Sequence, residues 1–111
     1  MVTGITEGTI ARTIELLDLD TKGIATAIGC TPGTLNRWRR GVQDPSPEFV
    51  PSLELIDAFL YDLQRKTRSR QRAREWFDER IPALGNHRPR DVFLEGKFAH
   101  LVVYLSQHER L

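Results

Sequence analysis

The segment IATAIGCTPGTLNRWRRG, residues 24–41, constrains the fold more than any other part of the chain, because it predicts two short helices joined by a tight turn. Gly29 stands where the first helix must stop, and glycine adopts the left-handed conformation of a helix end at little steric cost. Thr31 is a good N-cap for the next helix. Pro32 suits its first position, where a backbone N–H has no helical partner. We therefore predict one helix over residues 22–28 and a second that begins at Pro32 and ends before Gly41.

Four residues of this segment have an informative spacing. Ala25, Gly29, Leu35 and Trp38 lie at relative positions 0, 4, 10 and 13. A helix-turn-helix needs a small residue where its helices touch, a glycine in the turn, and apolar residues at two further points. The segment resembles the Xre-type, phage-repressor-like helix-turn-helix, including the Arg-Gly at its end and the proline that follows. The alternative is an unrelated helical hairpin.

The remaining apolar residues also follow helical spacing. Helices are predicted over residues 9–17, 52–63, 73–77, 89–94 and 97–108, each with apolar residues at i, i+3, i+4 or i+7. Residues 43–51 hold three prolines and predict a turn or an extended link. Because no β pattern is long enough to compete, the chain is predicted to be all-α with about seven helices.

The segment RKTRSRQRAR, residues 65–74, holds six cations in ten residues. If one helix ran from 52 to 77, Lys66, Arg70 and Arg74 would share the buried face of Leu63 and Phe77. An unpaired buried ion costs several kcal/mol, so we predict a break near residues 67–69. The run could contact phosphates, anchor an acidic partner or be solvated. If helical, the cations form two stripes, with Arg65, Arg68 and Arg72 on one side and Lys66, Arg70 and Arg74 on the other. We favour one stripe pairing internally with acidic residues and the other facing outward. The acidic candidates are Asp57, Asp62, Glu75 and Asp78.

The second half carries its own pattern. The segment WFDERIPALGNHRPRDVF, residues 76–93, has a tryptophan, then Pro-x-Leu-Gly, then Arg-Pro, then a short apolar helix. It resembles the toxin-binding domain of the Xre/MbcA/ParS antitoxins, in which an Xre-like helix-turn-helix precedes this domain. The resemblance implies an Xre-like domain over residues 1–66 and a toxin-binding domain over residues 67–111.

The same resemblance implies a partner and a role. The usual partner is a RES-domain toxin that degrades NAD⁺ or transfers ADP-ribose, and the antitoxin blocks its active site. The chain is then an antitoxin without catalysis of its own that also represses its operon, as a homodimer and as a hetero-oligomer with the toxin. A stand-alone transcriptional regulator is the alternative.

Candidate toxin-binding residues lie in two places. Glu109 and the carboxylate of Leu111 could imitate substrate phosphates if the final residues project from the body; a frayed tail is the alternative. The cations Arg88, Arg90 and Lys97 could line the toxin interface, and ordinary solvated surface charge is the alternative. The candidates are Arg88, Arg90, Lys97, His108, Glu109, Arg110 and Leu111.

Candidate DNA contacts lie on the helix that begins at Pro32. Arg37 is the best reader of a guanine edge, with Asn36 as a second reader. Thr31, Thr34 and Arg40 suit phosphates, which position the protein without specifying sequence. A monomer so equipped would bind weakly, and a dimer would place two such helices about 34 Å apart on a palindromic operator. Retention of the motif only as a scaffold is the alternative.

Composition narrows the classes further. The formal net charge is only +1, but residues 1–64 hold five Lys/Arg against nine Asp/Glu, whereas residues 65–111 hold eleven against six. We expect no bound metal or other cofactor, since the three histidines match no ligand spacing, and no catalysis, since no nucleophile–base set is evident. The first ten residues lack the features of an export signal, and no apolar run could cross a membrane, so we expect a cytoplasmic protein.

Overall fold

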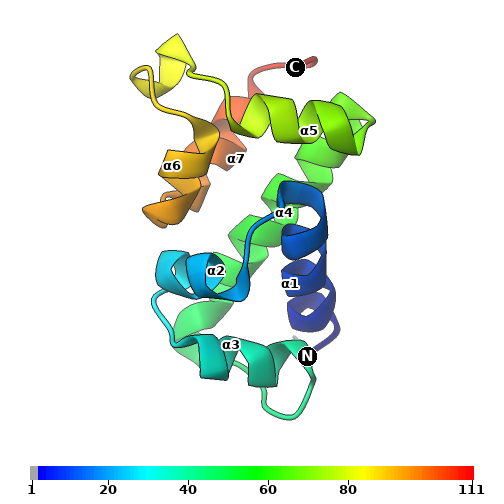
Figure 1. Ribbon diagram of the computed structural model, residues 1–111, viewed down its shortest axis with the longest axis vertical. Helices are drawn as coiled ribbons and strands as arrows, with labels where there is room; N and C mark the ends of the chain where they lie inside the picture. Colours follow the sequence, from blue (N-terminus) through cyan, green and yellow to red (C-terminus); the bar gives the residue numbers. More distant parts are fainter. Residues whose placement is uncertain (1–2) are drawn as a thin grey trace.

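The computed structural model describes residues 3–111, with side chains from residue 8 onward, and everything regular within that range is helical (Figure 1). This confirms the predicted all-α class. Residues 1 and 2, which begin the stretch searched for an export signal, lie outside the described residues. The α-helices are α1 (Thr3–Leu17), α2 (Thr21–Ile28), α3 (Pro32–Arg39), α4 (Val50–Thr67), α5 (Arg70–Phe77), α6 (Pro89–Leu94) and α7 (Phe98–Ser106), with short 3₁₀ turns η1 (Pro47–Phe49) and η2 (Pro82–Leu84).

The turn between α2 and α3 forms as its residues predict. Asp20 caps α2, Gly29 ends it with φ of 95°, and the Thr31 hydroxyl accepts from Thr34 N–H at the start of α3. Leu35 and Trp38 are 0% and 1% exposed, so the predicted inward face of α3 is confirmed.

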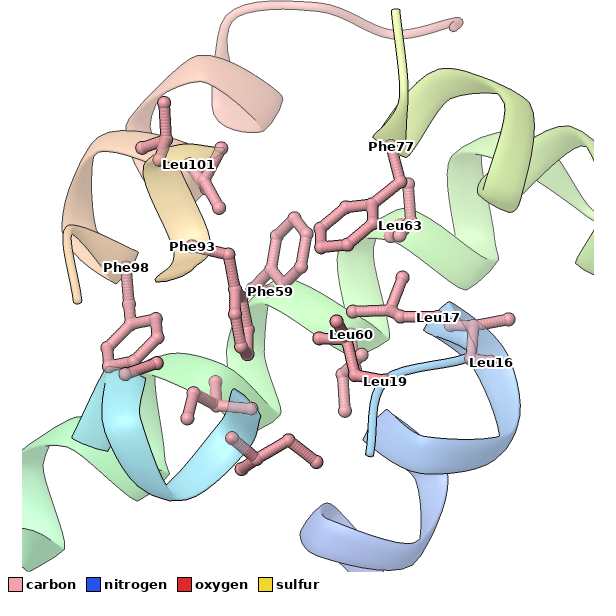
Figure 2. Close-up of a cluster of buried hydrophobic side chains, with 14 of the residues drawn as sticks. Leu16, Leu17, Leu19, Phe59, Leu60, Leu63, Phe77, Phe93, Phe98 and Leu101 are labelled. Atoms are coloured by element: carbon pink, nitrogen blue, oxygen red, sulfur yellow. The ribbon is translucent and has the colours of Figure 1, made fainter. Parts of the chain in front are cut away.

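Helix α4 runs through the middle of the molecule and carries the centre of the core. Phe59 is fully buried, and its ring lies 6.1 Å from that of Phe93, 6.2 Å from that of Trp76 and 6.4 Å from that of Phe77. Figure 2 shows Phe59 between Phe93 and Phe77. The labelled leucines of α1 and α4 lie on the side of Phe77. One hydrophobic core therefore joins the two predicted parts of the chain.

The predicted break between the fourth and fifth helices is confirmed. α4 ends at Thr67, and Arg68 takes the left-handed conformation with φ of 59° while its N–H bonds to Gln64 O. Ser69 then caps α5 by accepting from Arg72 N–H. The change of direction returns Phe77 to the core without burying the basic residues between.

Internal pairing is confirmed for one stripe of the basic run, since Arg65 pairs with Asp62 at 3.3 Å, but the prediction that the other stripe faces outward is wrong. Arg70 pairs with Glu15 at 2.6 Å, and Arg74 donates to the main-chain oxygens of Glu15 and Leu16 in the last turn of α1. Arg72, in the same stripe as Arg65, also pairs internally, with Glu79 at 2.7 Å and with Glu75 at 3.6 Å. The prediction of two stripes placed residues 65–74 on one continuous helix, but α4 ends at Thr67 and α5 begins in a new direction at Arg70.

Several helix boundaries also differ from the predictions; α4, for example, ends at Thr67 rather than residue 63, and α5 begins at Arg70 rather than residue 73. α1 begins at Thr3, well before the apolar spacing starts at Thr9. The proline-rich link contains η1 and ends earlier than predicted, because α4 begins at Val50 with Pro51 in its first turn. Proline there costs no helical hydrogen bond.

α2 also contacts the turn after α6. Gly96 has φ of 79°, and a Cβ at this position would lie 2.8 Å from the main-chain oxygen of Ala27. Only glycine permits both the left-handed turn and this approach. Among the described residues, no helix is long and apolar enough to span a bilayer.

The left-handed conformation at Arg68 leads to a stability prediction. Arg68→Gly should raise the free energy of unfolding by up to about 1 kcal/mol, because glycine adopts positive φ at lower cost. The matched control, Gln64→Gly one turn earlier inside α4, should lower it by about 1 kcal/mol. Urea denaturation measures both changes, and a destabilised Arg68→Gly variant would contradict the described break.

Candidate functional site

The exposed face of α3 holds the five predicted DNA-contacting residues. Thr31 and Thr34 lie at its start, where the Thr31 hydroxyl also donates to Thr34 Oγ1 at 2.9 Å. Asn36 is half-buried, and Arg37 is exposed on the middle turn. Arg40 is the exposed C-cap of the helix. The structure thus brings all five onto one short element at one end of the molecule (Figure 1).

The side chain of Arg37 is held in a defined position. Its Nε donates to Gln43 Oε1 at 2.8 Å, and Nη2 donates to Thr34 Oγ1 at 3.1 Å. Its Nη1 passes over Gly33, 3.6 Å from where a Cβ would stand. Because a guanidinium has five N–H donors, donors remain for an external acceptor. Gln43 was not predicted as part of this face, because it lies in the turn beyond the end of α3.

Arg88 and Arg90 are occupied by carboxylates of the same chain. Arg88 forms a two-pronged pair with Asp91, with contacts of 3.0 and 2.9 Å. Arg90 forms a second pair with Asp78 at 2.7 and 3.3 Å, and its guanidinium lies 5.1 Å from the centre of the Phe77 ring. Arg88 also lies 3.8 Å from Asp78, so both arginines link the start of α6 to the end of α5.

These pairs shift the ionisation of both carboxylates. The hydrogen bond from Arg90 is the main reason that the pKa of Asp78 lies below its ordinary value, and the charges of Arg90 and Arg88 add to the effect. The hydrogen bond from Arg88 likewise lowers the pKa of Asp91.

A groove of about 550 Å³ lies beside α6 and α7, and we call it the α6–α7 groove. Lys97 lies on it and pairs with Glu95 at 3.3 Å. Val103 also lines it and is 54% exposed, which marks an apolar surface outside the buried face of α7. Other lining residues are Ala83, Leu84, His87, Val92, Ala99, His100, Tyr104 and Gln107.

The C-terminal residues lie against the body. The His108 ring stacks on Tyr104 with centroids 4.1 Å apart, and Lys66 Nζ donates to His108 O. Arg72 Nε donates to the main-chain oxygen of Leu111 at 3.2 Å, and the Leu111 side chain packs against the core. Between these two anchors, Glu109 and Arg110 are exposed, and we call residues 108–111 the anchored tail.

The seven predicted toxin-binding residues therefore occupy three places: an ion-pair cluster at α6, the α6–α7 groove and the anchored tail. The groove was missed by the sequence analysis, although one signal pointed to it, since Val103 lies off the apolar spacing of α7. Cys30 is half-buried, and burial raises the pKa of its thiol. Within the described residues, no three His, Cys, Asp or Glu side chains gather as metal ligands.

Comparison with solved structures bears on the whole arrangement. One chain of the crystal structure of the M. tuberculosis MbcT–MbcA toxin–antitoxin complex superposes with a TM-score of 0.71 at 17% identity, over 98% of this chain and 94% of that one. The two chains share a fold. No protein-family model matches the sequence, and no curated protein matches it.

The match confirms the expected fold resemblance over almost the full length. It includes both the helices around α3 and those that carry the groove and the anchored tail, because so little of either chain is left unmatched. At 17% identity the match shows a shared backbone fold and does not assign roles to individual side chains.

The lowered pKa of Asp78 predicts a pH dependence. Because its folded pKa lies below the unfolded value near 4, the Asp78–Arg90 pair contributes stability above about pH 4 and loses it as pH falls through the folded pKa. Asp78→Asn should make the acid-induced loss of unfolding free energy less steep, with part of the slope left by Asp91. Arg90→Gln should do the same by removing the donor. Urea titrations between roughly pH 5 and pH 2 measure these slopes, and a wild-type slope in both variants would contradict the prediction.

Proposed function

We propose that this protein is an antitoxin that binds and neutralises a cognate toxin through its C-terminal half and binds its operator through α3. The observation that carries the proposal is the fold shared with a chain of a toxin–antitoxin complex over 98% of the sequence. The resemblance of residues 76–93 to the Xre/MbcA/ParS antitoxins supports the same role and implies a RES-domain toxin that acts on NAD⁺.

For the toxin contact, the anchored tail is the best candidate. Its anchors at His108 and Leu111 hold the main chain, while Glu109 and Arg110 face solvent between them. A segment whose main chain is already held loses little entropy on binding. A carboxylate at its exposed point can take the place of a substrate phosphate among the cationic groups and N–H donors of a nucleotide pocket. The proposed mechanism is occlusion of the toxin active site.

The anchored tail can be tested without disturbing its anchors. Glu109→Ala combined with Arg110→Ala should abolish growth rescue when the antitoxin is co-expressed with the toxin encoded beside it, and should weaken co-purification by at least about tenfold. Glu48→Ala, an exposed carboxylate at the α3 end, is the matched control and should rescue fully. Full rescue by the double variant would show that Glu109 and Arg110 are not needed for the toxin contact and would contradict this proposal.

For the DNA contact, the held guanidinium of Arg37 is the best candidate for reading a base. Two of its nitrogens are positioned by Gln43 and Thr34, so an Nη group is presented in a fixed orientation. Arg40 at the C-cap has no such support from a side chain of α3 and suits a phosphate. The half-buried Asn36 is placed beside them.

A binding assay on the promoter of the operon distinguishes these roles. Arg37→Ala should lose about 1–3 kcal/mol of preference for the operator, whereas Arg40→Ala should weaken all sequences alike and reduce the salt dependence. Gln43→Ala should lose part of the preference, because it releases Arg37. Arg80→Ala, at the opposite end, is the control. If neither α3 variant changes binding, α3 serves as a scaffold; sequence-specific binding without any toxin partner would favour the stand-alone regulator.

A further inference from the structure

A cavity of about 370 Å³ lies between α1, the end of α4 and the start of α5, and we call it the junction cavity. No residue of α3, of the α6–α7 groove or of the anchored tail lines it, so it is separate from the surfaces considered for operator and toxin. Its polar lining residues are Arg12, Glu15, Gln64, Arg68, Ser69 and Arg70.

Arg68 is the one cation of the basic run whose side chain makes no hydrogen bond or ion pair with the described residues. The other five all contact carboxylates or main-chain oxygens of this chain. Arg68 is exposed, and its main chain is held at φ of 59°. Glycine adopts this conformation at lower cost, and costly backbone positions are often found at ligand-binding sites. The arginine at this position therefore calls for a role outside the fold.

The other two arginines bring further donors to the junction cavity. Arg12 bonds to Asp57 and, through Nε, to the main-chain oxygen of Gly8 at 3.4 Å. Arg70 Nη2 pairs with Glu15 at 2.6 Å. These contacts use only some of the five N–H donors of each guanidinium. The side chains of Arg12 and Arg70 are 40% and 57% exposed, so the remaining donors can reach a ligand.

The lining determines the class of ligand. Three arginines and one carboxylate line the cavity, so positive charge is in excess even when Asp57, the partner of Arg12, is counted. Guanidinium groups match phosphate oxygens with paired N–H donors. No aromatic side chain lines the cavity, so none is placed to stack on a nucleotide base. The volume is near the lower end of the range for small-molecule sites. Together these features favour a small phosphate compound.

We propose that the junction cavity binds a small phosphate-bearing anion, such as pyrophosphate or a phosphomonoester, with Arg68 as its main contact and Arg12 and Arg70 beside it. Bound there, the anion links α1 to the turn between α4 and α5. It also neutralises the one cation of the basic run that the fold leaves without a partner. The site does not depend on the proposed contacts with toxin and operator.

Arg68 also borders a second cavity, of about 310 Å³, on the side of the anchored tail. Residues 65–67, in the last turn of α4, line only this second cavity, and the last main-chain oxygens of a helix disfavour an anion. Glu109 adds a carboxylate there. The junction cavity is therefore the better site, and Arg65 and Arg110 of the second cavity provide matched controls.

Isothermal titration calorimetry with sodium pyrophosphate, in a phosphate-free buffer of constant ionic strength, tests the site. The wild type should bind one pyrophosphate per chain with a dissociation constant below about 1 mM. Arg68→Gly should weaken binding at least about tenfold, because it removes the unpaired guanidinium. Since glycine suits the left-handed turn, unfolding does not explain such a loss. Arg65→Ala and Arg110→Ala each remove one positive charge outside the junction cavity and should leave binding unchanged.

A second variant should strengthen binding, which a damaged fold would not do. Glu15→Gln removes the only carboxylate of the lining and releases Arg70, so it should tighten pyrophosphate binding about threefold. Glu109→Gln is the matched control, because it neutralises a carboxylate at the second cavity and should have no effect.

The proposal is overturned if the wild type shows no saturable pyrophosphate binding, if Arg68→Gly binds as the wild type does, or if Arg65→Ala and Arg110→Ala lose as much as Arg68→Gly. An unchanged constant in Glu15→Gln would also contradict it. Operator duplex is titrated separately to distinguish the two sources of phosphate. Arg68→Gly should leave duplex binding unchanged, and weaker duplex binding would assign these arginines to nucleic-acid phosphates instead. Failure of the wild type to bind operator or toxin would contradict the proposed function and leave this site standing.

Discussion

The cost of burying charge at the junction of α4 and α5 organises much of this structure. A continuous helix would carry three cations of the basic run into the core, so the chain breaks at Arg68 and starts again at Ser69. The break does more than avoid the cost. It frees Arg70 and Arg74 to hold the end of α1, and it leaves Lys66 and Arg72 beside the anchored tail. One basic segment thus ties the last turn of α1 and the anchored tail to the same junction.

The two candidate surfaces lie at opposite ends of the long axis, which measures 39 Å (Figure 1). α3 occupies one end, and the anchored tail occupies the other. α4 connects them through a single core centred on Phe59. In the proposed function, this separation lets a DNA duplex and a toxin bind to one copy without colliding.

Much of the fold was predictable because the signals are local. Caps and helix ends depend on a few neighbouring residues, and Thr31, Gly29 and Ser69 act in the structure as the chemistry of their side chains or backbone requires. The burial of Leu35 and Trp38 followed from helical spacing alone. The break near residue 68 followed from the energy of burying charge. The beginning of α1 was not predictable in this way, because its first turns carry no amphipathic pattern.

The sequence by itself determined which segments are helical, where the capped turns fall and the face that each helix buries, since these depend on residues within a turn or two of each other. The tertiary structure alone decided which charged side chains are available. Arg90 is taken up by Asp78 of the preceding helix end, Arg70 by Glu15 of α1, and the tail is held by α4 and α5. A long flexible side chain can reach partners in many directions, so its contacts are fixed only when the packed core brings distant segments together.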